Sequence, residues 1–321
     1  MKKITLIIPC YNEEEMIHLL YKELCAVAKK LEIRENVQYE TELLFIDDGS
    51  KDRTLKFIKE LAVDDDRVGY ISFSRNFGKE AAMYAGFCNA TGDYVAVLDA
   101  DMQDPPSLLP EMVNILESGD YDSVAARRIH KAGRHVIHSC FAKMFYKIIN
   151  KSLPEDIMEG ARDFRLMKRE IVQVIIELKE SNRFSKGIFE WIGFRNCWYE
   201  YESVERAAGT TKWNFRSLFR YSLDGIFNFS SAPLNLIFSM GIIFVINSIV
   251  LIAAIIIFNL TGSVSLYEFG LLIGIIILFN GLQLLCLGII GHYISKIYQE
   301  SKHRPHYVAR ETSDENIKKI L

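Results

Sequence analysis

The sequence predicts an α/β protein with a mostly parallel sheet, followed by helices that associate with a membrane. Over about the first hundred residues, short apolar runs alternate with segments of helical periodicity. Polar segments follow the apolar runs, and two later segments, 225–267 and 269–291, contain no Asp, Glu, Lys or Arg. The alternation and the polar segments indicate a ligand-binding sheet, and the uncharged segments indicate membrane spans.

The expected strands and helices alternate along the chain. In order they are strand 3–9, helix 14–31, strand 39–47, helix 51–64, strand 68–74, helix 79–90 and strand 93–99. The strands are short apolar runs, whereas the helices repeat apolar residues at helical spacing. Ser50 is the expected N-cap of the helix over 51–64, with Asp52 in its first turn. This alternation predicts a parallel sheet covered by helices on both faces.

Each predicted strand ends in a polar segment that is suited to binding a ligand. These segments are 9–14, 47–50, 74–79 and 99–104. Ligands of parallel sheets bind beyond the carboxyl ends of the strands, which all lie at one edge. We therefore expect the four segments to build a single site.

The bulk composition narrows the class of protein. The chain has 321 residues and a formal net charge of −3, which excludes a generally basic nucleic-acid-binding protein. The six cysteines include no C-x-x-C pair, so neither a zinc nor a redox motif is indicated. The apolar run at the N-terminus is too short for a signal peptide, so we expect the soluble part in the cytoplasm.

Two segments, 230–260 and 269–294, exceed the ~20 apolar residues that cross a bilayer. The link between them has no Lys or Arg, whereas the outer flanks carry Arg216, Arg220, Lys296, Lys302 and Arg304. The positive-inside rule places these flanks and both termini in the cytoplasm, which makes the chain a multi-pass protein of the cytoplasmic membrane. The alternative is a pair of buried core helices, which the length of the uncharged segments disfavours.

These features divide the chain into four parts. Residues 1–211 are expected to form a cytoplasmic domain, and residues 230–294 two transmembrane helices. Between them, 212–229 repeats aromatic and leucine residues at helical spacing, as in a helix that lies in the membrane interface. An ordinary surface helix is the alternative there. Residues 295–321 form a cytoplasmic tail, which we expect to be loose after Lys302.

The acidic segment after the fourth strand indicates a metal site. Asp99, Asp101 and Gln103 offer the hard oxygen ligands that Mg²⁺ and Mn²⁺ prefer, usually together with substrate phosphates. Such an ion would neutralise a diphosphate leaving group. The sequence contains neither G-x-x-x-x-G-K-[ST] nor, after the first strand, G-x-G-x-x-G, which disfavours a P-loop and a dinucleotide fold.

Six segments together carry a resemblance to a known family. They are "IPCYNEEE", "FIDDGSKDRT", "SRNFGKEAA", "DADMQDPP", "DFRLMKRE" and "ERAAGTTKWNF". In order and spacing they resemble the motifs of family 2 glycosyltransferases, which have the Rossmann-like GT-A fold. The most similar group is the polyprenyl-phosphate glycosyltransferases, which include bactoprenol glucosyltransferases and relatives of dolichol-phosphate mannose synthase. The resemblance covers nearly the whole chain, paired spans included.

The resemblance implies a nucleotide-sugar donor and a role for most strand-end residues. Asp99 would contact the ribose and, with Asp101 and Gln103, belong to the Mg²⁺ or Mn²⁺ site. The implied donor-binding residues are Pro9, Tyr11, Asn12, Glu13, Asp47, Asp48, Lys79 and Asp99. Within this set, Tyr11 would stack on the base, and Asp47 or Asp48 would accept a base N–H or a ribose hydroxyl.

The resemblance also implies residues near the reaction centre. Asp163 would orient the sugar or act as a base, and the sequence leaves both roles open. Arg165 lies on the same face of a predicted strand and is a candidate phosphate ligand. Arg206 and Lys212 belong to a loop that would close over the diphosphate or the acceptor; ordinary interface cations are the alternative.

The implied acceptor is a polyprenyl phosphate such as undecaprenyl phosphate. With a second pKa near ~6, its phosphate is largely dianionic at neutral pH and needs no general base. No Asp or Glu occurs between Asp122 and Glu155, and Arg127, Arg128 and Arg134 in this stretch are the expected acceptor-phosphate residues. A solvated basic helix is the alternative reading of the stretch.

The implied reaction is an inverting, metal-dependent transfer of a hexose to the lipid phosphate on the cytoplasmic leaflet. Glucose from UDP-glucose is the expected donor group, with UDP-N-acetylglucosamine, GDP-mannose or an aminopentose donor as alternatives. A processive polysaccharide synthase would need more spans and a Q-x-x-R-W motif, and a non-catalytic membrane scaffold is the remaining alternative. Assembly into a homo-oligomer stays open.

Overall fold

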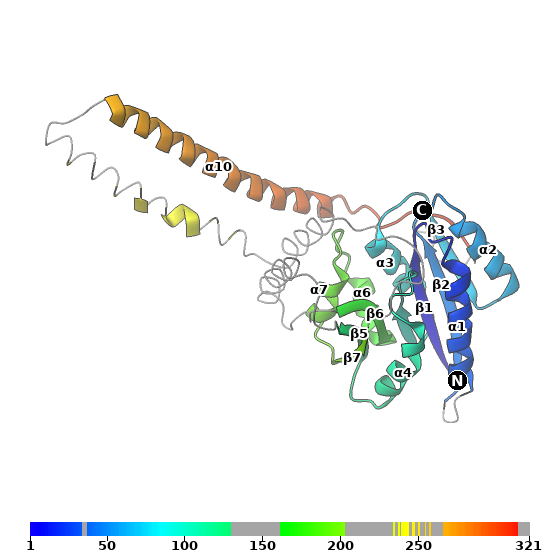
Figure 1. Cartoon of the computed structure of the whole chain (residues 1–321). Helices are drawn as coiled ribbons and strands as arrows, with labels where there is room; N and C mark the ends of the chain where they lie inside the picture. Colours follow the sequence, from blue (N-terminus) through cyan, green and yellow to red (C-terminus); the bar gives the residue numbers. More distant parts are fainter. Residues whose placement is uncertain are drawn as a thin grey trace.

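The computed structural model describes residues 1–33, 37–129, 161–202 and 266–313, with scattered helical positions between 234 and 257. In these residues one eight-stranded sheet has the order β7-β5-β6-β4-β1-β2-β3-β8. The first half is β1 (Lys2–Cys10), α1 (Ile17–Glu32), β2 (Tyr39–Asp47), α2 (Thr54–Asp64), β3 (Val68–Phe73), α3 (Lys79–Asn89) and β4 (Tyr94–Val97). Strands β1 to β4 are parallel to one another, as the alternation of strand and helix predicted (Figure 1).

The second half adds strands of both directions. Its elements are η1 (Pro106–Leu108), α4 (Leu109–Glu117), β5 (Ser123–Ile129), β6 (Ala161–Lys168), α6 (Arg169–Glu177), α7 (Ser185–Trp191), β7 (Asn196–Glu202), α10 (Leu266–Ser301) and β8 (Ala309–Thr312). Strand β6 is antiparallel to β4 and β5, and β8 is antiparallel to β3. The sheet is therefore mixed, with a parallel centre.

Alternate residues of the central strand β1 belong to two hydrophobic cores, one on each face of the sheet. Leu6 and Ile8 of β1 are buried on one face against α1 and α4, whereas Ile7 is buried on the other face against α3. This follows from the two-residue period of a strand, because both faces are covered and every β1 position from Ile4 to Ile8 is apolar or paired. The predicted two-sided cover by helices is confirmed.

The start of α2 differs from the prediction. The helix begins at Thr54, and Ser50 is not its cap. The Ser50 hydroxyl instead accepts the backbone N–H of Asn12 at 3.0 Å, and Asp52 accepts the N–H of Thr54 at 3.0 Å. The loop before α2 therefore connects the ends of β1 and β2 by hydrogen bonds. The N-cap pattern in the local sequence does not predict these long-range contacts.

The membrane prediction is described only in part. The second expected span, 269–294, lies within α10, which extends away from the sheet (Figure 1). Among the described residues one helical stretch, Leu278–Ser301, is long and apolar enough to cross a membrane. The helix expected over 212–229 lies outside the described residues, as does most of the span expected over 230–260.

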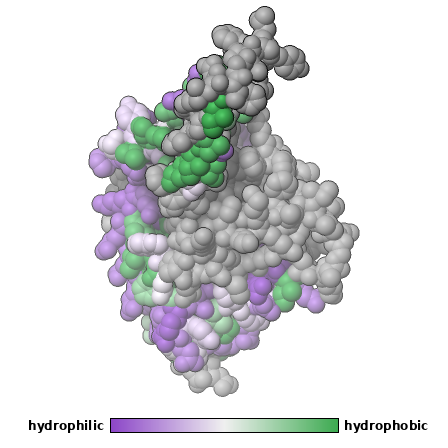
Figure 2. Space-filling model, turned by 90° about the vertical axis from the view of Figure 1, so that its left-hand side faces the viewer, coloured by the Kyte–Doolittle hydropathy of each residue, from purple (hydrophilic) through white to green (hydrophobic). Residues whose placement is uncertain are grey.

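Apolar side chains are exposed along α10. Leu278, Leu284 and Ile294 are 69%, 65% and 60% exposed, and Figure 2 shows hydrophobic surface on the described part of this projection. Such a surface is costly in water. A membrane or the surface of another protein would cover these apolar side chains.

The expectation of a loose tail after Lys302 is wrong for the residues up to Ser313. Strand β8 pairs with the edge strand β3, and Tyr307 is fully buried with its ring stacked on Phe73 at 4.9 Å. Lys59 of α2 forms an ion pair with Glu311 at 2.6 Å. The chain after α10 thus returns to the domain and completes its sheet.

Candidate active site

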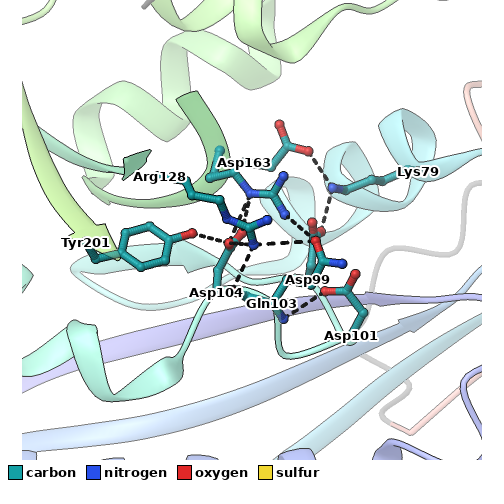
Figure 3. Close-up of polar contacts among 9 residues, drawn as sticks. Lys79, Asp99, Asp101, Gln103, Asp104, Arg128, Asp163 and Tyr201 are labelled. Carbon is teal, nitrogen blue, oxygen red and sulfur yellow. Dashed lines mark hydrogen bonds and ion pairs between the residues drawn. The ribbon is translucent and has the colours of Figure 1, made fainter. Parts of the chain in front are cut away.

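Three charged side chains from distant parts of the chain meet at the edge of the sheet where β4 ends. Lys79, the first residue of α3, lies with its Nζ 2.5 Å from a carboxylate oxygen of Asp99. The same ammonium forms an ion pair with Asp163 of β6 (Figure 3). The predicted site residues Lys79, Asp99 and Asp163 are therefore brought together.

The charges of these groups depend on one another. Burial lowers the pKa of Lys79, but the carboxylates of Asp163 and Asp99 outweigh it and raise that pKa above its usual range. Burial also opposes ionisation of Asp163, yet the ammonium of Lys79 and then that of Lys186 hold its pKa well below the usual range. Asp163 is thus a fixed negative charge and a weak proton acceptor.

The acidic turn after β4 has a tight backbone. Met102 has a φ of 53°, in the left-handed region that few non-glycine residues adopt, and the Gln103 N–H donates to Asp101 Oδ1 at 3.1 Å. This turn presents Asp99, Asp101 and Gln103 on one short segment. Asp101 and Gln103 lie beyond the end of β4, as predicted, whereas the predicted strand 93–99 included Asp99 and β4 ends two residues before it, at Val97.

Asp104 at the end of this turn is buried and surrounded by donors. Arg162 Nε donates to both carboxylate oxygens of Asp104 at 3.0 Å, and Arg128 Nη2 lies 3.3 Å from Oδ1. Tyr201 of β7 donates its hydroxyl to the same carboxylate (Figure 3). Arg162 also donates to Gln103 Oε1 at 3.1 Å. Asp104 therefore fixes the turn to β5, β6 and β7.

Sequence reasoning missed this arrangement in part. Asp104 lies in the segment 99–104 that is expected at the site, but the sequence gives it no role. Arg162 and Tyr201 are not among the expected site residues, and Arg128 is expected at the acceptor phosphate. In the sequence, Arg162 is adjacent to Asp163 and Asp104 is adjacent to Gln103. This adjacency to expected site residues is the sequence feature that could have identified them. The structure uses Arg128 and Arg162 as cations that hold the acidic turn.

The donor set of the turn fits a divalent cation by its chemistry. Mg²⁺ takes one or two carboxylates and completes its shell with substrate phosphates and water. Asp99 and Asp101 would supply the carboxylates and Gln103 an amide oxygen; in this structure Asp99 is paired with Lys79, and Gln103 Oε1 accepts from Arg162. Within the described residues, no three side chains from His, Cys, Asp and Glu are grouped closely enough to hold a metal ion by themselves.

A cavity of about 480 Å³ opens over the ends of β1, β2 and β3, and no residue of the acidic turn lines it. Tyr11 and Asp47, both expected to bind the donor, line it together with Ser72. The Asp47 carboxylate accepts the Ser72 hydroxyl at 2.7 Å and the Ser50 N–H at 3.1 Å. Its orientation in the cavity wall is thereby fixed, and a carboxylate has further lone pairs for a ligand.

Asp48, the other carboxylate of the pair, has a different position. It is buried, does not line the cavity, and accepts the backbone N–H groups of Phe77 and Gly78 at 2.6 and 2.9 Å. Burial raises the pKa of Asp48 to about 6, although these two hydrogen bonds lower it. The structure thus distinguishes the two carboxylates, and Asp48 anchors the loop between β3 and α3.

The remaining residues expected around the donor connect the loops. Asn12, with a φ of 54°, accepts the Lys51 N–H at 2.8 Å through its side chain. The Glu13 N–H donates to Thr54 Oγ1 at 2.8 Å, and Pro9 pairs opposite Ile46 at the end of β1. These contacts hold the first two strand-end loops together beside the cavity.

Arg165 is not placed where a phosphate could contact it. Its side chain is buried, with Nη2 2.9 Å from Glu190 of α7 and its guanidinium 4.4 Å from the centre of the Phe189 ring. Helix α7 covers the side of β6 on which Arg165 lies, through Glu190 and Phe189. Arg165 therefore belongs to the packing between β6 and α7.

The other expected cations have varied outcomes. Arg127 forms an ion pair with Glu200 of β7 at 2.8 Å. Arg134, Arg206 and Lys212 lie outside the described residues, so their roles stay predictions.

Comparison with known proteins identifies similar sequences. The sequence model of Glycosyl transferase family 2 matches residues 5–176. A putative glycosyltransferase, CsbB of Bacillus subtilis (strain 168), is 46% identical over 98% of this chain and 93% of its own. The bactoprenol glucosyl transferase of Shigella phage SfV is 40% identical over 96% of this chain and 98% of its own.

Solved structures give a more distant likeness. Mannosyl-3-phosphoglycerate synthase from Rubrobacter xylanophilus is 17% identical with a TM-score of 0.47, covering 70% of this chain and 72% of its own. The mannosyltransferase PcManGT from Pyrobaculum calidifontis, in complex with GDP-Man and Mn²⁺, has the same identity and TM-score over 70% of this chain and 62% of its own.

Proposed function

The chain belongs to glycosyl transferase family 2, and from this premise we propose that it transfers a hexose from a nucleotide sugar to a polyprenyl phosphate at the cytoplasmic face of a membrane. The observation that carries the proposal is the similarity to a bactoprenol glucosyl transferase over nearly the full length of both chains. That name supports glucose as the sugar and a bactoprenol-type lipid as its carrier. UDP-glucose is our proposed donor.

The donor lies across the carboxyl ends of the central strands. Its nucleoside occupies the cavity lined by Tyr11 and Asp47, and its diphosphate lies at the acidic turn after β4. The sheet order supports this direction, because β4, β1, β2 and β3 are consecutive neighbours. Strands are spaced about 4.8 Å apart, so the cavity and the turn are separated by about 10 Å. An extended nucleoside diphosphate has this reach.

A divalent cation is part of the proposal. Asp101 and Gln103, with Asp99, would hold Mg²⁺ or Mn²⁺ against the diphosphate, where the ion supplies positive charge to the leaving group. The chain's own contribution is to keep this turn in place. Asp104 does so through Arg128 and Arg162, and Arg162 also holds the Gln103 amide.

The acceptor phosphate needs positive charge more than it needs a base. A phosphate monoester has a second pKa near ~6 and is already a dianion at neutral pH. We assign Asp163 to orienting Lys79 and the sugar, because its ionised carboxylate is held in an ion pair. Lys79, between Asp99 and Asp163, lies at the expected junction of donor and acceptor.

The position of α10 supports a membrane-bound acceptor. The helix exposes large apolar side chains along its length, and its last turn is held to the catalytic domain by Glu300, which accepts the Ser181 N–H at 2.8 Å. The domain would therefore sit at the membrane surface, where a lipid phosphate is presented. Membrane insertion through two spans, with both termini cytoplasmic, is part of the same proposal.

Donor binding tests the first half of this proposal. Purified full-length protein is titrated with UDP-glucose, UDP-N-acetylglucosamine and GDP-mannose, each with and without Mg²⁺. We expect one donor to bind with metal dependence, and Asp101→Asn to weaken that binding at least about tenfold, since charged hydrogen-bonding groups contribute about 1.5–3 kcal/mol.

The matched control is Asp64→Asn, which removes an exposed carboxylate at the end of α2. It should leave the affinity unchanged. Absence of binding for all three donors would contradict the proposed reaction with these sugars, and equal effects of the two variants would remove the metal role from Asp101.

A further inference from the structure

The C-terminal strand β8 supplies a cation to the cavity that we assign to the nucleoside. Arg310 lines this cavity, although it is more than two hundred positions from the other lining residues in the sequence. It also lies beyond residues 5–176, which the family's sequence model matches. The cavity is therefore not complete without the segment that follows α10.

The pairing of β8 with β3 explains why Arg310 reaches the cavity. Ser72 pairs with Glu311 and Phe73 pairs with Ala309, so Arg310 is an extra residue in the ladder. Such an irregularity redirects a side chain, and it is a common feature of strands beside binding sites. Ser72, opposite the irregularity, lines the same cavity and donates to Asp47.

The strand is held firmly on both sides of Arg310. On one side, Tyr307 is fully buried and the Ser74 N–H donates to the Val308 carbonyl at 2.9 Å. On the other side, Glu311 pairs with Lys59, and the Ser313 hydroxyl accepts the Tyr70 N–H at 2.8 Å. Arg310 itself is exposed, and within the described residues its guanidinium makes no hydrogen bond or ion pair. A fixed backbone with an uncommitted guanidinium suits ligand binding.

The place of β8 in the sheet determines which part of a ligand Arg310 meets. The order β4-β1-β2-β3-β8 puts Arg310 at the edge of the sheet farthest along this row from Asp99 and the acidic turn. A diphosphate at that turn is about four strand spacings, or roughly 19 Å, from β8. Arg310 is therefore at the nucleoside end.

From this placement we propose that Arg310 is a donor-binding residue that donates hydrogen bonds to a carbonyl oxygen of the nucleobase. The proposal rests on the proposed function for the identity of the ligand as a nucleotide sugar. A guanidinium offers several N–H donors in a fixed fork and no acceptor, so its partner must be an acceptor such as a base carbonyl. Donor binding then depends on the strand that follows the membrane helix.

The test compares the nucleoside diphosphate and its nucleoside on the full chain. UDP and GDP are titrated first, by calorimetry, to find the one that wild type binds more tightly. That nucleotide and its nucleoside are then titrated into wild type, Arg310→Gln and Lys59→Gln. Lys59→Gln is the matched control, because Lys59 contacts β8 through Glu311 but does not line the cavity.

We expect Arg310→Gln to raise the Kd of nucleotide and nucleoside by the same factor, about 10- to 100-fold. Lys59→Gln should bind like wild type, and all three proteins should melt at similar temperatures. An unchanged Kd for Arg310→Gln overturns the proposal. A loss that appears for the diphosphate but not for the nucleoside also overturns it, because Arg310 would then bind a phosphate.

Failure of the proposed function has a different signature. If wild type binds neither UDP nor GDP, the nucleotide-sugar reaction itself is contradicted, and Arg310 loses its proposed ligand. If wild type binds one of them and the Arg310 variant matches it, the reaction stands and only the role of Arg310 is wrong.

Discussion

Asp104 is the residue on which the arrangement of the acidic turn depends. Its buried carboxylate neutralises two guanidinium groups, those of Arg128 and Arg162, and accepts the Tyr201 hydroxyl. Removing one partner of an ion pair that has a buried member is strongly destabilising, whereas exposed ion pairs contribute little. Asp104 therefore has more effect on the fold than the more exposed carboxylates of the same turn.

We predict that Asp104→Asn lowers the free energy of unfolding by about 3 kcal/mol, because two partly buried guanidinium groups then lose their charged hydrogen bonds to a buried carboxylate. Urea denaturation of the purified protein measures this. Asp120→Asn is the control, since Asp120 is exposed and its loss should change stability by less than about 0.5 kcal/mol. Equal stabilities for the two variants would contradict the role of Asp104.

Glu80, next to Lys79, gives the site a pH-dependent stability. Burial raises the pKa of Glu80 to about 7, although hydrogen bonds from Ser185 lower it. The folded protein thus holds this proton more tightly than the unfolded chain does. The free energy of unfolding should therefore fall as the pH rises from about 4.5 to about 7 through this group.

We predict that Glu80→Gln removes this part of the pH dependence. The stability of wild type relative to the variant should decrease by up to about 3 kcal/mol as the pH rises from 4.5 to 7. Denaturant titrations of both proteins at a series of pH values measure the difference. A constant difference across the range would mean that Glu80 is not protonated preferentially in the folded protein.

The strand-end pattern predicted Asp99 and Asp101 at the sheet edge, and the family resemblance predicted Asp163 there, but neither predicted the role of Asp104 or the partners of the arginines. The strand alternation predicts that Arg165 shares a face of β6 with Asp163, two residues before it. It gave no information about Glu190 and Phe189, which α7 brings over that face from a separate part of the chain. Partners across the fold are set by tertiary packing, which has no local sequence signal.

At the scale of elements, the sequence predicted strands well where a continuous apolar run defines them, and poorly where a strand depends on a partner far away in the sequence. Strand β2 begins and ends at the predicted residues, 39 and 47, because its apolar run is buried on both faces. Strand β8 was missed: it has only four residues, and the hydrogen bond from Tyr70 to Ser313, directly after the strand, joins positions 243 apart. A short edge strand with a long-range partner lacks the length and periodicity on which prediction depends.

Tyr307 tests whether β8 is a fixed part of the domain. We predict that Tyr307→Ala lowers the free energy of unfolding by about 3–5 kcal/mol, as expected for a fully buried aromatic ring. Tyr307→Phe is the matched control. It keeps the stacking on Phe73 and removes only the hydroxyl, which accepts from Asn89 at 3.4 Å, so its cost should stay below about 1.5 kcal/mol. A small effect of the alanine variant would indicate that β8 is dispensable.

At the scale of the whole molecule, a catalytic domain and an apolar helix are connected in two ways. Glu300 at the end of α10 holds Ser181 of the domain, and the chain then continues into β8 beside the donor cavity. The position of α10 therefore determines where the domain lies relative to the surroundings that cover the apolar surface of this helix. We infer that these surroundings are the membrane that contains the acceptor.

We predict that Leu284→Asp combined with Leu287→Asp reduces the membrane-bound fraction of the protein. Both leucines are more than half exposed on α10, and a charged side chain at a bilayer centre costs about 2.5–3.5 kcal/mol. Fractionation of expressing cells, with alkaline extraction of the membranes, measures the fraction. Leu19→Asp is the control, because Leu19 is 41% exposed on α1 of the catalytic domain. Equal fractions for all three proteins would contradict insertion of α10.

The central claim is transfer of a sugar to a lipid phosphate, and one assay addresses it. Full-length protein in detergent receives Mg²⁺, radiolabelled UDP-glucose and either undecaprenyl phosphate or undecaprenol, and the label extracted into the organic phase is counted. We predict label with undecaprenyl phosphate, none with undecaprenol, and a loss of at least about tenfold for Asp101→Asn. Bound but untransferred UDP-glucose would contradict the account, and so would equal labelling of both lipids.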